Sequence, residues 1–186
     1  FENGEFTEIS TNLIGGNIDV LELDPIDSDI IYVAINQSLR KSTDHGVTFT
    51  NLFNFSNNIT SIEVNNNDNS IVYVTTRGNN GGVFKSLNQG VSFTDITGTL
   101  PSVVKNIVKH QPDTPDNILY LGTSLGVFRF DEGLNTWRSY NSGLPNVSVT
   151  DLDINIIDNK VIASTYGRGV WQSEMAVGEL PLNDVK

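Results

Sequence analysis

Ser42-Thr43-Asp44-His45-Gly46-Val47-Thr48-Phe49 is the first of three related stretches that decide the fold of this chain. The second is Ser-Leu-Asn-Gln-Gly-Val-Ser-Phe over residues 86–93, and the third is Phe-Asp-Glu-Gly-Leu-Asn-Thr-Trp over residues 130–137. Each stretch carries a glycine shortly before an aromatic residue, and the aromatic residues Phe49, Phe93 and Trp137 follow one another at equal intervals of 44 residues. A fixed period of roughly 20–50 residues is typical of a repeat architecture.

Runs rich in β-branched and aromatic residues separate these stretches and predict short strands. The first full repeat has an apolar run at 18–23, an Asp-rich turn at 24–29, a second run at 30–35 and a third at 39–42. No segment keeps a helical period over the ~10 residues that a helix needs. Four strands per repeat predict an all-β fold, a β-propeller of four-stranded antiparallel blades with about four blades in this chain.

The repeats divide the chain into predicted blades. Residues 1–10 match the last strand of a repeat, because Phe6-Thr7-Glu8-Ile9 is similar to Phe49-Thr50-Asn51-Leu52. Three complete repeats cover residues 11–55, 56–101 and 102–145, a repeat without a fourth strand covers 146–175, and 176–186 is interpreted as a linker or tail. Residues 1–10 could complete the last repeat and close a ring of four blades, or the chain could be part of a larger ring. We favour the larger ring, since the chain starts abruptly.

Composition limits the partners. The 186 residues carry a formal net charge of −11, which repels nucleic-acid phosphates and anionic membrane surfaces. There is no cysteine, which excludes disulfides and thiolate metal sites. No apolar run approaches the ~20 residues of a membrane-spanning helix. We therefore expect neither nucleic acid nor a membrane span.

The three stretches resemble the Asp-box, or bacterial neuraminidase repeat, written Ser-x-Asp-x-Gly-x-x-aromatic. The matching residues are Ser42, Asp44, Gly46 and Phe49 in the first stretch, Ser86, Asn88, Gly90 and Phe93 in the second, and Gly133 and Trp137 in the third. Such boxes occur in sialidases, xyloglucanase-type glycosidases, sortilin-like receptors and photosystem assembly factors. The resemblance implies that the box is a structural turn between the third and fourth strands, away from the chemistry. We accordingly expect Asp44 to bond the turn's backbone and to be neither catalytic nor a metal ligand.

The end of the chain resembles a second family feature. Residues 179–186, Glu-Leu-Pro-Leu-Asn-Asp-Val-Lys, look like the lead-in to the C-terminal sorting domain of Bacteroidetes proteins exported by type IX secretion. This resemblance implies a bacterial protein that is secreted or held at the cell surface.

Candidate catalytic groups are carboxylates on the predicted first strands, which line the channel of a propeller. A glycosidase needs two of them on either side of the scissile bond. The candidates are Asp19, Glu22, Glu63, Asp151 and Asp153. Carboxylates on a solvated strand face are far commoner, so we assign no catalytic residue. The arginines do not form the cluster that a sialidase needs to grip a carboxylate.

The remaining features concern binding. Loop residues Arg77, Tyr166 and Arg168 could form a rim that binds a ligand, although a plain hairpin connection is the commoner role of such loops. The oxygen-rich turns 24–29 and 65–69 leave Ca²⁺ open as a ligand, but we prefer to interpret them as turns and expect no cofactor and no metal site. The sequence thus predicts a non-catalytic binding or scaffold module, whose partner is a glycan, an extracellular protein or the remaining blades of its own parent protein. The alternative is part of a secreted glycoside hydrolase, or a propeller appended to another secreted hydrolase.

Overall fold

The computed structural model of the protein describes residues 4–13, 16–78, 80–114 and 116–177, and within these ranges it contains strands and no helix. The first sheet has β1 (Val20–Leu23), β2 (Ile31–Ile35), β3 (Ser38–Ser42) and β4 (Thr50–Asn54). The second has β5 (Ile59–Val64), β6 (Val72–Thr76), β7 (Val83–Ser86) and β8 (Thr94–Asp95). The third has β9 (Lys105–His110), β10 (Leu119–Thr123), β11 (Gly126–Asp131) and β12 (Thr136–Ser139). The last has β13 (Val149–Asn155), β14 (Lys160–Thr165) and β15 (Gly169–Glu174).

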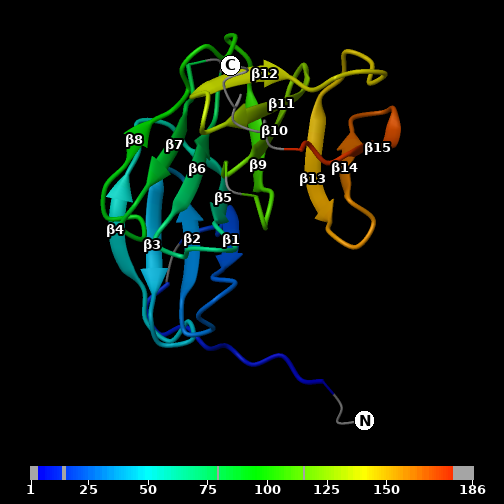
Figure 1. Cartoon of the computed structure of the whole chain (residues 1–186). Coiled ribbons are helices and arrows are strands. Elements are labelled where there is room, and N and C mark those ends of the chain that lie inside the picture. Colours follow the sequence, from blue (N-terminus) through cyan, green and yellow to red (C-terminus); the bar gives the residue numbers. More distant parts are fainter. Residues whose placement is uncertain (1–3, 14–15, 79, 115, 178–186) are drawn as a thin grey trace, which may run out of the picture.

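The sheets are arranged as the blades of a β-propeller. Every sheet is an antiparallel meander in chain order, and β1, β5, β9 and β13 contact one another in sequence as its inner strands. Figure 1 shows the blades side by side along an open arc, with β1–β4 at one end and β13–β15 at the other. The predicted all-β propeller with about four blades is confirmed.

The core lies between successive blades, because a twisted four-stranded sheet cannot bury both of its faces alone. Three apolar clusters fill the three junctions. Tyr32 and Ile62 pack between the first two blades, Tyr73 and Leu121 between the next two, and Tyr120 with its neighbours between the last two. The middle strands β6 and β10 are buried along their whole length, as their continuous apolar sequences predict.

A tyrosine on the second strand of each of the first three blades lies at the junction with the next blade. In the first three blades this tyrosine stands opposite a basic residue of the third strand; the pairs are Tyr32–Lys41, Tyr73–Lys85 and Tyr120–Arg129. At the first junction the Tyr32 hydroxyl donates to the Gln89 carbonyl at 3.3 Å, and Lys41 Nζ donates to Gln89 Oε1 at 2.7 Å. At the second, Lys85 pairs with Glu132. We call these contacts, which run from the tyrosine or basic residue of one blade to the corner of the next, the interblade latch.

The third junction uses the chain that follows β15. The Ala176 amide donates to the Tyr120 hydroxyl at 2.6 Å, that hydroxyl donates to Gln111 Oε1 at 2.6 Å, and Gln111 Nε2 donates to the Ala176 carbonyl at 2.9 Å. Ala176 is buried among the residues of this junction. The expected free tail from residue 176 is therefore docked at its first residue, because Tyr120 and Gln111 satisfy both of its backbone groups. Residues 178–186, including the sorting-domain resemblance, lie outside the described residues.

Residues 4–10 do not form the strand expected over 1–10; residues 1–3 lie outside the described part. The segment belongs to no sheet, and the Phe6 side chain is fully exposed. The reason is the lack of a neighbour: a fourth strand needs the edge of a third strand beside it, and blade 1 already has β4 at that place. The segment nevertheless touches blade 1, since Ile9 packs on Gly46 and the Thr11 amide donates to the Val47 carbonyl at 2.9 Å.

Candidate functional site

A polar hollow lies where the inner strands begin. It has a volume of about 590 Å³. Its lining includes one polar residue from the start of each of the four inner strands or the turn before it, namely Asp19, Thr60, Asn106 and Thr150, together with Arg77. We call this the rim hollow.

β-Bulges aim three of these side chains. The pairing of β5 with β6, of β9 with β10 and of β13 with β14 shifts register at one residue, and the unpaired residue is Thr60, Asn106 or Thr150 respectively. A bulge leaves one residue out of the ladder and redirects its side chain, which is why bulges recur beside binding and active sites. The same device in three successive blades thus brings three polar groups to one place.

The contacts inside the rim hollow show which groups are occupied. Asp19 Oδ2 accepts the Asn36 amide at 2.7 Å, and Asn106 Nδ2 donates to the Val149 carbonyl at 2.7 Å. The Thr60 hydroxyl donates to the Lys105 carbonyl at 2.9 Å and lies 2.8 Å from the Thr75 hydroxyl, and the Thr150 hydroxyl lies 2.8 Å from that of Ser164. Among the described residues the Asn106 oxygen has no donor and remains available as an acceptor. The Arg77 side chain is exposed and makes no hydrogen bond or ion pair with another described residue. Arg77 is therefore the group best able to bind something that enters the hollow.

The other two predicted rim residues, Tyr166 and Arg168, lie on the β14–β15 loop and do not line the hollow. Tyr166 is exposed, and its amide donates to the carbonyl of Ser148, a lining residue, at 2.8 Å. The Arg168 carbonyl accepts the indole N–H of Trp171 at 2.9 Å. The structure therefore places Tyr166 beside the wall of the hollow and separates Arg168 from it.

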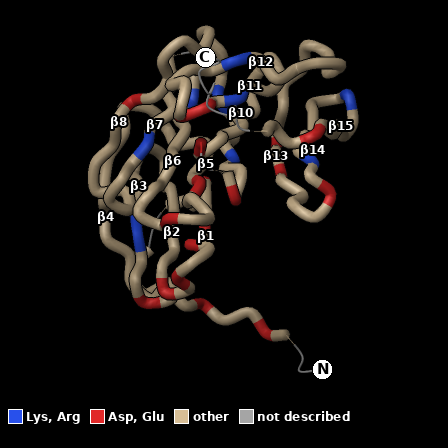
Figure 2. Tube along the Cα trace, viewed as in Figure 1, with Lys and Arg blue, Asp and Glu red and all other residues tan. Residues whose placement is uncertain are grey.

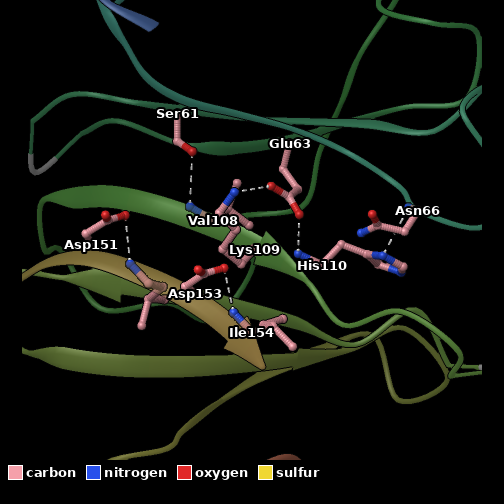
Figure 3. A network of polar contacts seen from close by, with 10 residues as sticks. Ser61, Glu63, Asn66, Val108, Lys109, His110, Asp151, Asp153 and Ile154 are labelled. Carbon is pink, nitrogen blue, oxygen red and sulfur yellow. Dashed lines mark hydrogen bonds and ion pairs between the residues drawn. The ribbon is translucent and has the colours of Figure 1, made fainter. Parts of the chain in front are cut away.

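The opposite ends of the inner strands carry a network of charged side chains around a second hollow of about 270 Å³. Acidic residues lie on β1, β5 and β13 (Figure 2). Figure 3 shows Glu63 between its two partners: Lys109 Nζ donates to Oε2 at 2.9 Å, and the His110 amide donates to Oε1 at 2.9 Å. Because both carboxylate oxygens are bonded and the side chain is only 5% exposed, Glu63 holds β5 against β9. Lys109 was not predicted, and its strand, Lys-Asn-Ile-Val-Lys-His over residues 105–110, offers no signal that distinguishes it from Lys105.

Burial and charge together shift the pKa values of this network. Burial raises the pKa of Glu22 to about 7, with the nearby Glu63 charge acting in the same direction and Lys109 against it. Burial also raises the pKa of Glu63, while Lys109 and the His110 amide oppose the rise. Burial alone would lower the pKa of Lys109, but Glu63, Glu22 and Asp153 outweigh it, so the lysine stays charged. Burial lowers the pKa of His110 to about 4.

The five candidate catalytic carboxylates are not brought to one place. Asp19 lines the rim hollow, whereas Glu22, Glu63 and Asp153 line the hollow at the opposite end. Asp151 and Asp153 each accept the backbone amide of the following residue, at 2.9 and 2.8 Å (Figure 3). Glu22, Glu63 and Asp153 thus share one hollow. Of these three, Glu63 forms an ion pair, with Lys109, whereas Glu22 and Asp153 form none with a described residue.

The turns considered for Ca²⁺ are held by their own side chains. Asp24 Oδ1 accepts the amides of Ile26 and Asp27, both at 2.9 Å, and Asn65 Oδ1 closes the equivalent turn of the next blade in the same way. Within the described ranges, no group of three or more His, Asp or Glu side chains is placed to hold a metal ion. In these turns the Oδ1 atoms act as acceptors for backbone amides.

The first two glycine–aromatic stretches form one kind of corner between the third and fourth strands. In the first, Ser42 Oγ accepts the Gly46 amide at 2.9 Å and donates to Asp44 Oδ1 at 2.7 Å, which in turn accepts the Thr48 amide at 2.8 Å. Gly46 has a φ of 86°, which glycine adopts without strain, and Phe49 is buried. Ser86, Asn88 and Gly90 repeat these bonds in the second corner, and the Asn88 side chain donates to Ser92 Oγ at 2.9 Å.

The third stretch folds differently. Gly133 stands four residues before Trp137 rather than three, and the residue of positive φ is Asn135, at 47°. Glu132, which takes the Asp place, turns away to pair with Lys85 of the preceding blade, and its other oxygen accepts Asn117 Nδ2 at 2.8 Å. Trp137 is still buried and donates to the Ile96 carbonyl at 2.7 Å. The aromatic residue is thus retained at this corner while the turn before it changes.

No protein-family model and no curated protein matches this chain. Solved structures do match it. The GH74 xyloglucanase from Xanthomonas campestris superimposes with a TM-score of 0.68 at 17% identity, over 83% of this chain and 29% of that chain. The GH74 enzyme from Niastella koreensis gives a TM-score of 0.69 at 18% identity, over 83% and 28%. YCF48 from Cyanidioschyzon merolae gives 0.67 at 14% identity, over 88% and 53%.

These likenesses, at low identity, show the fold alone. The class of protein that fold and comparisons define is the β-propeller. The chain spans between about a quarter and about half of the length of the solved chains it matches. Of the described residues, no helix is long and apolar enough to cross a membrane.

Proposed function

We propose that this propeller is a non-catalytic binding module whose ligand is a neutral glycan held in the rim hollow. The observation that carries the proposal is the convergence of Thr60, Asn106 and Thr150, each aimed by a β-bulge, beside the exposed Arg77. The Thr60 and Thr150 hydroxyls are partly engaged within the protein, so the Asn106 oxygen and the Arg77 guanidinium supply the acceptor and donors for the hydroxyls of a sugar. The net charge of −11 disfavours acidic polysaccharides.

The size of the hollow supports this proposal. Small-molecule sites commonly measure ~300–1,000 Å³ and combine an apolar lining with a few placed polar groups. The rim hollow has about 590 Å³, and Val20, Ile59 and Val104 supply apolar surface beside the polar ring. The solved relatives include a xyloglucanase, so xyloglucan oligosaccharides are the first ligands to test.

Calorimetric titration with xyloglucan oligosaccharides tests the proposal, with cellohexaose and polygalacturonate as comparison ligands. We expect binding of the neutral oligosaccharides and at least tenfold weaker affinity in Arg77→Ala. Arg138→Ala, on the outer strand β12, is the matched control and should bind like the wild type. Arg168→Ala should also bind normally, since Arg168 lies outside the hollow. No binding to any of these ligands, or equal affinity in Arg77→Ala, would contradict the proposal.

A glycoside hydrolase is the second candidate function. It is favoured by Glu22, whose pKa is raised to about 7 by burial and which shares a hollow with Asp153. A protonated acid beside a second carboxylate is the pair that glycosidases use. If this chain hydrolyses xyloglucan, reducing ends should appear, and Glu22→Gln should abolish their release. The binding module predicts no release from either protein.

Export and a larger parent protein are also part of the proposal. The similar solved chains are longer than this one, which supports the presence of further blades or domains in a parent protein. Secretion rests on the resemblance of residues 179–186 to the lead-in of a sorting domain. Detection of the protein in the culture medium or on intact cells tests this, and recovery only inside the cells would contradict it.

A further inference from the structure

A second pocket lies on the same face of the propeller as the rim hollow, where the second and third blades meet. It has a volume of about 310 Å³. The loop after β6, the end of β8 and the segment that leads into β9 line it, and its polar lining includes Asp95, Thr97 and Lys105. We call it the loop pocket. Both blades that form it are complete four-stranded sheets.

Lys105 occupies a position that is apolar in the neighbouring blades. It comes directly before the bulged residue of β9, as Ile59 does in β5 and Val149 does in β13. All three residues are buried, Ile59 with 2% of its surface exposed, Lys105 with 1% and Val149 with none. Burying an ammonium group costs free energy, and the burial lowers the pKa of Lys105 while Asp95 opposes the shift. The fold alone therefore favours an apolar residue here, and the lysine indicates a further role.

The groups beside Lys105 are held in place and supply both kinds of hydrogen-bonding partner. Asp95 Oδ1 accepts the Thr97 amide at 2.8 Å, and no described residue bonds to Asp95 Oδ2. Thr97 Oγ1 accepts the Val83 amide at 2.9 Å, and its own hydroxyl hydrogen can still donate. The loop pocket thus offers a fixed acceptor at Asp95 and donors at Thr97 and Lys105, whose opposite charges balance one another.

The loop after β6 forms a tightly packed wall of the loop pocket. A Cβ on Gly82 would lie 2.7 Å from Phe84 Cζ, and a Cβ on Gly81 would lie 2.1 Å from the Thr76 carbonyl oxygen, so both positions require glycine. The Gly82 amide donates to Thr76 Oγ1 at 2.9 Å. The connections at the same place in the first and third blades, 36–37 and 124–125, are only two residues long. The longer loop therefore gives this junction a wall that those blades lack.

The loop pocket adjoins the rim hollow. Asn106, which lines the rim hollow, directly follows Lys105, and Cα atoms of consecutive residues lie about 3.8 Å apart. The same loop supplies Arg77 and Gly78 to the rim hollow, and Gly81 and Gly82 to the loop pocket. One elongated ligand can therefore occupy both.

We propose that the loop pocket is a second sugar subsite, in which Lys105 and Thr97 donate to the hydroxyls of a sugar unit and Asp95 accepts from them. This unit continues the glycan that occupies the rim hollow, so the inference rests on the proposed function. The balanced charges suit a neutral sugar, and Phe84, Leu100 and Pro101 provide apolar surface for its ring. The volume of about 310 Å³ lies at the lower end of the ~300–1,000 Å³ of small-molecule sites, which suits a short part of the ligand.

Calorimetric titration of the full chain with xyloglucan oligosaccharides of increasing length tests the subsite. For the longest ligand we expect at least tenfold weaker affinity in Lys105→Ile and in Asp95→Asn, and for the shortest ligand no change. Lys105→Ile introduces the residue that β5 carries at the equivalent position, so its thermal unfolding midpoint should be no lower than that of the wild type. Asp68→Asn is the matched control and should bind normally, because Asp68 Oδ1 accepts the Ser70 amide at 2.9 Å in the same way but at the opposite end of the blade.

The results separate the subsite from the proposed function. If Arg77→Ala weakens binding while Lys105→Ile and Asp95→Asn bind the longest ligand like the wild type, the rim hollow stands and the subsite is overturned. If no oligosaccharide binds, both are overturned. Binding that needs Lys105 and Asp95 but not Arg77 supports the loop pocket and contradicts the rim hollow. A lower unfolding midpoint in Lys105→Ile, with unchanged affinity in Asp95→Asn, overturns the subsite, because Lys105 would then be a structural residue.

Discussion

Replacement of Lys109 by Met should destabilise the protein to an extent that depends on pH. Lys109 is the charged partner of Glu63, with an Nζ–Oε2 distance of 2.9 Å, and the Glu63 side chain is only 5% exposed. Methionine keeps most of the length and apolar contact of the lysine stem. The variant therefore removes the charge and leaves a buried carboxylate with the His110 amide as its remaining partner.

The size and direction of the effect follow from proton linkage. Burial already raises the pKa of Glu63 above the ordinary value of 4.5, and Lys109 is the strongest group that opposes the rise. Without Lys109, folded Glu63 keeps its proton over a range in which the unfolded chain has lost it. The folded state then binds more protons, so its stability falls as pH rises, by about 1.4 kcal/mol per pH unit. Removing one partner of a buried ion pair costs ~3–5 kcal/mol. We expect more of this loss at about pH 7.5, where glutamate is ionised in the unfolded chain, than at about pH 5.

Glu22 and Asp153 also face Lys109. Lys109 lowers the pKa of Glu22, so its removal raises that pKa further above about 7 and adds to the loss at high pH with the same sign. Glu22→Gln in both the wild type and the variant removes this contribution. Asp153 raises the pKa of Lys109 by attraction and loses that partner in the variant.

Urea denaturation at about pH 5 and about pH 7.5 measures the difference between variant and wild type. We expect the loss at the higher pH to approach ~3–5 kcal/mol and the loss at the lower pH to be clearly smaller. The double variant Glu63→Gln/Lys109→Met is the control: it carries neither charge, so its own free energy of unfolding should not change with pH through this pair. A loss in Lys109→Met that is equal at both pH values would refute the reasoning, since it would show that Glu63 does not carry the effect.

Two further predictions concern buried hydroxyls. Tyr120→Phe should lower the free energy of unfolding by about 1–3 kcal/mol, because the Tyr120 hydroxyl joins the docked tail to blade 3. Tyr73→Phe should cost little, because the Tyr73 hydroxyl has no hydrogen-bond partner among the described residues. Thermal unfolding of the two variants compares them directly. Ser42→Ala should cost about 1–3 kcal/mol in the same assay, since it leaves the buried Gly46 amide without its acceptor, and a loss no larger than that of an exposed serine would contradict the role of this corner.

The fold could be predicted because each blade repeats the same local signals. The interval between Phe49, Phe93 and Trp137 gives the length of a blade, and turns closed by Asp24 or Asn65 mark where its first strand ends. These signals act within a few residues, so one sequence is enough to locate them. The third corner was grouped with the first two because Trp137 keeps the interval of 44 residues, although Gly133 stands one position further from its aromatic residue than Gly46 and Gly90 do.

The candidate site was less predictable, because it depends on contacts between blades. Arg77 could be named from its loop, but Thr60, Asn106 and Thr150 reach the rim hollow through β-bulges. A bulge leaves no fixed mark in the sequence, and each of these residues looks like an ordinary polar position of a strand. Lys109 likewise gains its role only from Glu63, which is far away in the chain.

The interblade latch distinguishes the junctions within the arc from its two ends. Tyrosine stands opposite a basic residue in the first three blades, but the corresponding pair in the last blade is Ile162 and Gln172. At the other end, the corner position that Gln89 holds in the second blade is occupied by His45, which pairs with Asp29 of its own blade at 3.0 Å. The last blade therefore lacks the tyrosine and basic residue of the latch, and the corner of the first blade lacks the residue that would receive them. The latch therefore joins blades within the arc, and other side chains take its places in the first corner and in the last blade.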